Sequence, residues 1–162
     1  GLTILKSGKL FQNMDTLDSC TSSGIIDMLD YYNINVSGKN AVVIGRSLLV
    51  GKPVSMLLNN RNATVTMCHS KTENLSEITR KADIIVIAIG VPNFLTSDMV
   101  KEGAVVIDVG INRVNGKLVG DASFEELKEK CSYITPVPGG VGQMTVYELY
   151  ENVYKTLKLK NM

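Results

Sequence analysis

The sequence contains few of the residues that build metal sites and disulfide frameworks. Its 162 residues include three cysteines, one histidine and no tryptophan. The cysteines, Cys20, Cys68 and Cys131, are far apart and form no C-x-x-C pair, which argues against a zinc site and against structural disulfides. We therefore predict reduced thiols and no bound metal, and reduced thiols are typical of a cytoplasmic protein.

An excess of charge and a long apolar run are also missing. Lysine and arginine together number 17, against 16 aspartates and glutamates, so the formal net charge is +1. This balance provides no general attraction for nucleic acid or for an anionic membrane surface. No apolar run approaches the ~20 residues that span a bilayer. We therefore expect neither a nucleic acid nor a membrane as a partner, and the chain length suits one globular domain.

Short apolar segments alternate with segments of helical period along most of the chain. Strands are predicted at residues 40–45, 63–68, 83–90, 103–110 and 132–135. Helices are predicted at residues 21–34, 52–60, 74–82, 96–101 and 123–130, with a last helix from about residue 145. This alternation predicts an α/β fold, a Rossmann-like doubly wound parallel sheet with helices on both faces. Ligands of such folds bind at the carboxyl ends of the strands.

The predicted strands and helices divide the chain into three segments. Residues 1–20 show no sustained period and are predicted to be a connecting segment, residues 21–145 to be the Rossmann-like domain, and residues 146–162 to be a C-terminal helix. Two capping boxes, Ser123 with Glu126 and Thr145 with Glu148, are predicted to open the last two helices. Apolar side chains share one face of the C-terminal helix, namely Val146, Leu149, Tyr150, Val153 and Leu157.

The stretch VVIGRSLLVGKP has the glycines of a phosphate-binding loop. It is not a Walker A loop, because five residues separate Gly45 from Gly51 and Pro53 replaces the hydroxyl residue that would hold Mg²⁺. Gly45 ends a predicted strand and Gly51 begins a predicted helix, where a dinucleotide-binding fold places the pyrophosphate. The G-x-G-x-x-G spacing is also absent, because Ser47 stands in place of the middle glycine. A glycine-bearing turn without a ligand therefore remains an alternative.

The loop after the second predicted strand indicates which dinucleotide would bind. An NAD site commonly has an acidic residue here for the ribose 2′-hydroxyl. This chain instead reads CHSKT, with His69, Ser70 and Lys71, and Arg46 lies in the neighbouring loop. Hydroxyl and cationic groups suit a 2′-phosphate, so NADP is favoured over NAD. Arg46 with Ser70 is the stronger pair, since His69 and Lys71 also fit a solvated loop.

Four motifs, GRSLLVGKP, CHSKT, VIDVGIN and YITPVPGGVGQMT, carry a resemblance over essentially the whole chain. The sequence resembles the methylenetetrahydrofolate dehydrogenase/cyclohydrolase family, the bifunctional NADP-dependent folate enzymes of one-carbon metabolism, which serves purine biosynthesis. The resemblance implies that Gly45, Arg46 and Ser47 contact the cofactor, and the position of Gly51 at the helix start adds it to the cofactor-binding residues. The resemblance also implies that Ser70 contacts the 2′-phosphate and that Ile111 lies against the cofactor.

The resemblance further implies a loop on the folate side of the active cleft, made of Pro138, Gly139, Gly140, Val141, Gly142, Gln143, Met144 and Thr145. A rigid turn before the last helix, with a cis bond at one of its prolines, is the structural alternative. The chain departs from the family pattern at Gln143, where proline is usual. It also reads Ser19-Cys20-Thr21-Ser22 where Pro-Cys-Thr-Pro is usual. We expect the loss of two prolines to loosen the start of the first predicted helix.

In this family a folate-binding domain precedes the cofactor domain and contains the catalytic lysine in a Tyr-x-x-x-Lys motif. Gly1 resembles the last glycine of that domain's Asp-Val-Asp-Gly. The resemblance therefore implies no catalytic residue in this chain, little turnover by the chain alone, and a C-terminal helix that packs back toward the missing domain. It also implies a homodimer and a tetrahydrofolate derivative as substrate. Tyr154 and Lys158 share the motif's spacing and are interpreted as a coincidence.

Two other functional classes remain open from the sequence. The first is an NADP-binding module without catalysis. The second is another NADP-dependent dehydrogenase, of shikimate type, in which the cofactor domain also comes last. A short-chain dehydrogenase would need a Tyr/Lys pair on a helix in the middle of the domain, and the sequence has none there. The segment PVPGGVGQMT argues against both of these other enzymes.

Overall fold

The computed structural model describes residues 2–160, so Gly1 and the last two residues of the predicted C-terminal helix lie outside the described part. Within that part, five parallel strands form the central sheet in the order β2-β1-β3-β4-β7. The strands are β1 (Asn40–Ile44), β2 (Thr64–Cys68), β3 (Ile84–Ile87), β4 (Val105–Asp108) and β7 (Tyr133–Ile134). The predicted α/β class and parallel sheet are confirmed.

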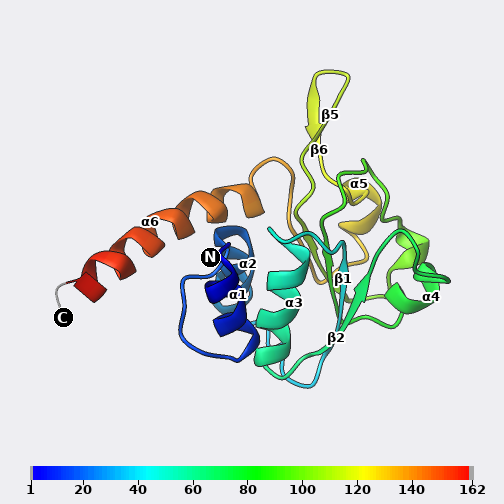
Figure 1. Cartoon of the computed structure of the whole chain (residues 1–162). Coiled ribbons are helices and arrows are strands. Elements are labelled where there is room, and N and C mark those ends of the chain that lie inside the picture. The colour runs from blue at the N-terminus through cyan, green and yellow to red at the C-terminus, as the bar shows by residue number, and fades with distance from the viewer. Residues whose placement is uncertain (1, 161–162) are drawn as a thin grey trace.

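The helices lie on both faces of this sheet (Figure 1). They are α1 (Ile4–Phe11), α2 (Cys20–Tyr31), α3 (Gly51–Asn60), α4 (Leu75–Thr79), the 3₁₀ helix η1 (Ser97–Met99), α5 (Phe124–Leu127) and α6 (Val141–Lys160). A two-stranded hairpin, β5 (Asn112–Val114) with β6 (Lys117–Val119), projects from the domain. No helix within residues 2–160 is both long and apolar enough to cross a membrane.

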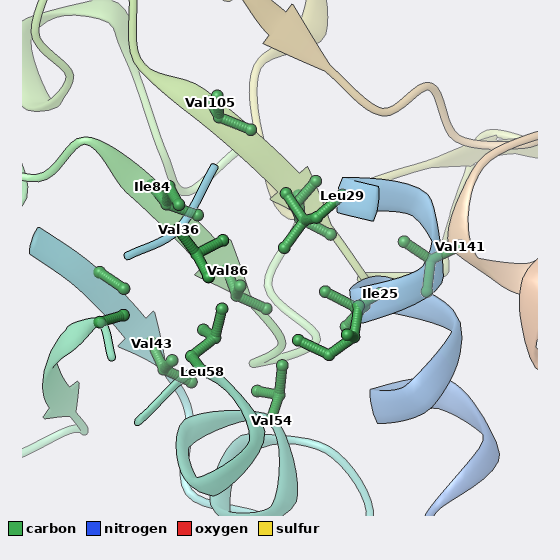
Figure 2. Close-up of a cluster of buried hydrophobic side chains, with 14 residues drawn as sticks. Ile25, Leu29, Val36, Val43, Val54, Leu58, Ile84, Val86, Val105 and Val141 are labelled. Atoms are coloured by element: carbon green, nitrogen blue, oxygen red, sulfur yellow. The ribbon is translucent and has the colours of Figure 1, made fainter. Parts of the chain in front are cut away.

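Alternate strand residues supply separate hydrophobic clusters on the two faces. On one face, side chains of α2 and α3 pack on the sheet, and Figure 2 shows Ile25 and Leu58 converging with Val43 and Val86. The other cluster includes Ile85 of β3 and packs against η1 and α5. Residues i and i+1 of a strand point to opposite faces. A strand covered on both faces must therefore be apolar throughout, as β3 is.

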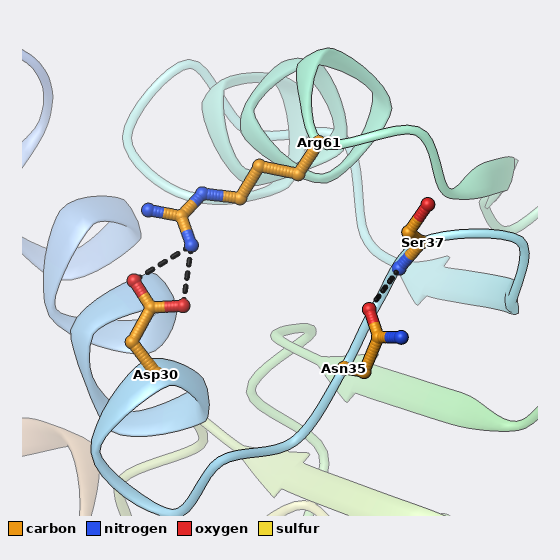
Figure 3. Close-up of polar contacts among 4 residues, drawn as sticks. All are labelled: Asp30, Asn35, Ser37 and Arg61. Atoms are coloured by element: carbon orange, nitrogen blue, oxygen red, sulfur yellow. Dashed lines mark hydrogen bonds and ion pairs between the residues drawn. The ribbon is translucent and has the colours of Figure 1, made fainter.

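An ion pair ties α2 to the end of α3. The Nη1 of Arg61 lies 2.5 and 2.6 Å from the two carboxylate oxygens of Asp30, as Figure 3 shows. In the same region the amide of Ser37 donates to Oδ1 of Asn35 over 3.0 Å and closes the turn after α2. Asp30 and Arg61 are both well exposed, so the pair contributes little to stability.

The segment predicted to connect domains contains the helix α1. The hydroxyl of Thr3 accepts from the amide of Lys6, and Leu10 is buried. The side-chain amide of Asn60, at the end of α3, donates to the carbonyl of Leu10 over 3.0 Å. A helix of eight residues is marginal by itself. Its contact with α3 therefore explains why the local sequence pattern did not reveal it.

The predicted capping boxes are wrong in the structure. Helix α6 begins at Val141, four residues before Thr145, whose hydroxyl donates to the carbonyl of Val141 instead of capping. Ser123 makes no side-chain cap to α5, and the carboxylate of Glu126 instead accepts from the amide of Ser97. Both motifs have the spacing of a capping box, but their side chains bond elsewhere. Thr145 lies inside α6 rather than at its start, and Glu126 bonds to a backbone amide of another segment.

Candidate cofactor and folate-loop site

The candidate site lies where the chain changes direction across the sheet. Strand β1 lies between β2 and β3, so the connections after β1 and after β3 diverge at their carboxyl ends. Doubly wound folds bind ligands in the crevice at this point. Gly45 follows β1 directly, and its amide donates to the carbonyl of Cys68 at the end of β2 over 2.9 Å. The glycine loop and the CHSKT loop are therefore neighbours, as the sequence predicted.

Both glycines of the first loop are required by close backbone approach. Gly45 has φ of +120°, and a Cβ atom added to it would lie 2.4 Å from the carbonyl oxygen of Ala88. A Cβ atom on Gly51 would lie 2.2 Å from the carbonyl oxygen of Gly45. The start of α3 thus lies directly against the end of β1. This contact places the start of α3 at the crevice, where the positive end of the helix dipole favours a phosphate.

Hydrogen bonds of Ser47 hold this loop together. Its Oγ accepts from the amides of Val50 over 3.1 Å and of Gly51 over 3.3 Å, and its carbonyl accepts from Lys52 over 3.0 Å. The hydroxyl proton of Ser47 is not used by these bonds and remains able to donate to an anion. Arg46 and Ser47 are both exposed. A serine in place of the middle glycine therefore shapes the loop and adds a donor.

The CHSKT loop is a closed turn with exposed polar groups. The amide of His69 donates to the hydroxyl of Thr72 over 2.9 Å, and Nδ1 of His69 accepts from the amide of Lys71 over 3.1 Å. His69 therefore has a local structural role. Ser70 and Lys71 are exposed. Arg46 and Ser70 each follow by two residues the paired strand ends Ile44 and Cys68, so the register places them at corresponding positions.

A buried carboxylate that sequence reasoning missed shapes the third loop. Asp108 ends β4 and is 3% exposed. Its carboxylate accepts from the amides of Gly110, Asp121 and Ala122 over 2.9, 3.0 and 2.8 Å. Burial raises the pKa of Asp108, and the three amides partly oppose that rise. This aspartate holds the chain after β4 against the chain after the hairpin.

Asp121 holds the loop after β3 in place in the same way, through its carboxylate. It is fully buried, and one carboxylate oxygen accepts from the amides of Ile89 and Gly90 over 2.7 and 2.9 Å. Its other oxygen accepts from the side-chain amide of Asn112 over 2.8 Å. The two aspartates therefore fix the loops that line the crevice. An acidic residue at the end of an otherwise apolar strand, as in VVID, is the sequence signal that could have indicated Asp108.

A cleft of about 260 Å³ brings Ile111 together with the predicted folate-side loop. Its lining includes Ile111, Leu118 of the hairpin and residues 136–143. Ile111 is 66% exposed, so its side chain is available to a ligand. Gly139 has φ of +104°, and the Val137–Pro138 bond is cis. The segment that the sequence predicted as either a rigid turn or a wall of the cleft is therefore both.

The predicted folate-side loop divides into two parts. Residues 138–143 line the cleft, although Val141 is also buried in the core beneath it. Met144 and Thr145 instead face α2. A Cβ atom on Gly24 would lie 2.8 Å from Cβ of Met144, and the hydroxyls of Thr145 and Thr21 lie 3.1 Å apart. The last two residues of the predicted set therefore support the loop from the α6 side.

Tyr154 and Lys158 lie near the end of α6, which extends away from the sheet (Figure 1). Nζ of Lys158 lies 4.6 Å from the ring centroid of Tyr154.

Residues 19–161 match the sequence model of the family described as "Tetrahydrofolate dehydrogenase/cyclohydrolase, NAD(P)-binding domain". The chain belongs to this family. The match covers most of the chain and includes the glycine loop, the CHSKT loop and the cleft. It favours this family over the shikimate-type alternative.

Curated relatives of this folate-enzyme family are similar along nearly the whole chain. The chain is 59% identical over 161 residues to "Bifunctional protein FolD" of Thermodesulfovibrio yellowstonii, covering 99% of this chain and 56% of the relative. It is 57% identical over 159 residues to the protein of the same name from Bacillus subtilis, covering 98% and 56%. The chain thus spans a little more than half the length of these relatives.

Solved structures of the family have the same fold. A bifunctional FolD methylenetetrahydrofolate dehydrogenase/cyclohydrolase from Campylobacter jejuni superposes with a TM-score of 0.97 at 49% identity, over 98% of this chain and 57% of that one. A FolD from Trypanosoma brucei, solved with NADP cofactor and an inhibitor, gives 0.92 at 38% identity, over 98% and 57%. A yeast NAD-dependent methylenetetrahydrofolate dehydrogenase, at 23% identity and a TM-score of 0.77, shares the fold.

Proposed function

We propose that this chain is the NADP-binding part of a cytoplasmic enzyme with two activities, methylenetetrahydrofolate dehydrogenase and methenyltetrahydrofolate cyclohydrolase. The cleft between Ile111 and residues 136–143, at the same carboxyl edge of the parallel sheet as the glycine loop, carries this proposal. It supports one ligand that extends from a phosphate-binding loop to a narrow apolar cleft, as a dinucleotide does. Family membership and the FolD relatives support the two reactions.

The residues around the crevice fit a dinucleotide phosphate by their chemistry. The positive end of the α3 dipole and the hydroxyl of Ser47 would hold the pyrophosphate. Arg46 and Ser70, at corresponding positions after β1 and β2, would hold the 2′-phosphate. The cleft beside Ile111 would hold the nicotinamide end, which accepts a hydride from the folate methylene carbon when bound. The protein's contribution is to orient this ring and to exclude water from it.

A calorimetric titration with NADP⁺ and with NAD⁺ tests the cofactor assignment. We expect saturable binding with NADP⁺ preferred. Charge-assisted bonds to phosphate contribute about 1.5–3 kcal/mol, so Arg46→Ala should weaken NADP⁺ binding by roughly 10- to 100-fold and leave NAD⁺ binding nearly unchanged. Arg80→Ala is the matched control, because Arg80 follows α4 near the amino ends of the strands. Equal affinities for the two nucleotides would refute the 2′-phosphate site.

We further propose that catalysis needs residues outside these 162. The resemblance implies a catalytic lysine in a folate-binding domain, and the chain covers 56% of the FolD relatives. Expected turnover by this chain alone is little or none. Both reactions are followed by absorbance, the dehydrogenase by NADPH formation and the cyclohydrolase by loss of methenyltetrahydrofolate. Full activity of this chain in both assays would refute this part of the proposal.

The exposed apolar face of α6 supports the proposal that the C-terminal segment, residues 146–162, packs on a part of the protein outside this domain. Val146, Leu149, Tyr150, Val153 and Leu157 are each more than half exposed. A stripe of this kind usually contacts another part of a protein. We propose that it packs against the folate-binding domain and that residues 21–145 form a homodimer. Light scattering on the chain measures the second point, and a monomer at all concentrations would refute it.

A further inference from the structure

Two serines at the start of α2 reach across to the glycine loop. The hydroxyl of Ser19 donates to the carbonyl of Leu49 over 2.5 Å. The hydroxyl of Ser22 lies 3.3 Å from the carbonyl of Val50 and 3.5 Å from that of Leu49. Ser19 is 9% exposed and Ser22 is fully buried, so these bonds are shielded from water. They join positions about thirty residues apart in the chain.

The carbonyls that accept these bonds belong to the segment that begins α3. The opposite edge of the same backbone is held by Ser47, whose Oγ accepts from the amides of Val50 and Gly51. Val50 packs against the core cluster, but the side chains of Leu48 and Leu49 are 72% and 57% exposed. The shape of residues 46–49 therefore depends largely on hydrogen bonds to serine hydroxyls.

These hydroxyls are not needed by α2 itself. Ser19 occupies the N-cap position, but within the described part of the chain its side chain makes no capping bond to α2. Its φ of −63° is one that proline also adopts. Ser22 lies in the first turn, where a missing amide is tolerated. We expected the loss of two prolines to loosen this helix start, yet both serines donate their hydroxyls to the glycine loop.

We propose that Ser19 and Ser22 are positioning residues that hold the cofactor loop, residues 46–51, in its binding shape before the nucleotide arrives. This inference rests on the proposed function, because it assigns the clamp to the cofactor site. A loop that is ordered in advance loses less conformational freedom on binding, which raises affinity. The two serines thus act on cofactor affinity through the backbone of Leu49 and Val50.

Two double variants separate the hydroxyls from the helix geometry. Ser19→Ala with Ser22→Ala removes both hydroxyls, and Ser19→Pro with Ser22→Pro removes them while retaining a backbone that suits the start of a helix. The matched control is Thr79→Val, because Thr79 is fully buried and its hydroxyl bonds to the carbonyls of Leu75 and Ser76 within α4. The control deletes a buried hydroxyl far from the cofactor loop.

Amide hydrogen exchange and calorimetry with NADP⁺ are then measured on the 162-residue chain. We expect both double variants to speed exchange in residues 46–51 about tenfold and to weaken NADP⁺ binding by roughly 3- to 10-fold, as the loss of two net hydrogen bonds implies. Thr79→Val should leave both values at those of the unsubstituted chain, even where its urea midpoint falls. If the alanine variant does not fold, the hydrogen exchange and NADP⁺ affinity of the proline variant test the proposal.

Each other outcome has a separate meaning. Unchanged exchange in residues 46–51 would overturn the clamp. Faster exchange with unchanged NADP⁺ affinity would overturn the positioning role and leave the proposed function intact. Absence of NADP⁺ binding by the unsubstituted chain would instead refute the proposed function and, with it, the assignment of the clamp to a cofactor site.

Discussion

Glu148 should make the stability of this domain fall with rising pH. It lies on α6, is 1% exposed and faces α2, where the carboxyl of Asp27 is within hydrogen-bonding reach. Burial, with the bond and charge of Asp27 next, raises the pKa of Glu148 from 4.5 to about 7. Lys155 opposes this rise and Glu151 adds to it. A protonated Glu148 can donate to Asp27, whereas an ionised one is a buried carboxylate beside another acid.

The sign and size of the effect follow from proton linkage. The folded state holds the proton of Glu148 more tightly than the unfolded state does. Its contribution to stability is therefore complete below about pH 4.5 and is lost as the pH rises through about 7. One pKa unit corresponds to about 1.4 kcal/mol, so the whole change is roughly 3 kcal/mol. Glu148→Gln keeps the shape and a hydrogen-bond donor but cannot ionise.

Urea unfolding at pH 5 and pH 8.5, followed by circular dichroism, measures this difference. We expect Glu148→Gln to gain about 2 to 3 kcal/mol over the unsubstituted chain between the two pH values. Titrating groups other than Asp27, which bonds to Glu148, contribute equally to both proteins, so the difference isolates this carboxyl pair. Glu129→Gln, at an exposed glutamate after α5, should show no such gain. Parallel pH dependences for Glu148→Gln and the unsubstituted chain would refute the argument.

Three further predictions concern the loops and a thiol. Gly51→Ala should destabilise the domain by more than about 2 kcal/mol in urea unfolding, because the new Cβ atom would collide with the carbonyl of Gly45. Gly8→Ala, in α1 with no atom within 4 Å of the added Cβ, should instead stabilise by about 0.5–1 kcal/mol, and equal effects would contradict the reasoning. Asp121→Asn should cost roughly 1–3 kcal/mol, because an amide group replaces an acceptor of buried donors, and faster hydrogen exchange at residues 89–90 checks the location. Burial raises the pKa of Cys131 to about 11, so mass spectrometry at pH 8 should find it alkylated roughly a hundredfold more slowly than a free thiol, and comparable rates would contradict this.

The fold could largely be predicted because its signals are local. Parallel strands covered on both faces must be continuously apolar, and β1, β3 and β4 are such runs in the printed sequence. The pair Asn115-Gly116 in the printed sequence is a hairpin-turn signal of the same local kind, and both residues adopt the positive φ that such a turn requires. The strands of that hairpin have three residues each, which is too short for a recognisable period.

The candidate site could be predicted only in part. Gly45 and Gly51 were identified because strained or crowded backbone excludes other residues, and this constraint is visible in one sequence. Asp108 and Asp121 were missed because an isolated acid in an apolar run does not reveal its partners. Most of the amides that bond to them belong to other loops, up to 32 residues away.

The sequence by itself therefore determined the alternation of the sheet strands with helices, the glycine loop, and the polar groups of the neighbouring CHSKT loop. These features depend on residues close together in the chain, where propensity and steric limits act. Only the tertiary structure decided that α1 forms against α3, that Met144 and Thr145 face α2, and that Ser19 and Ser22 hold the loop at Leu49. Each of these depends on a contact between distant segments, whose energy appears only once the sheet has brought them together.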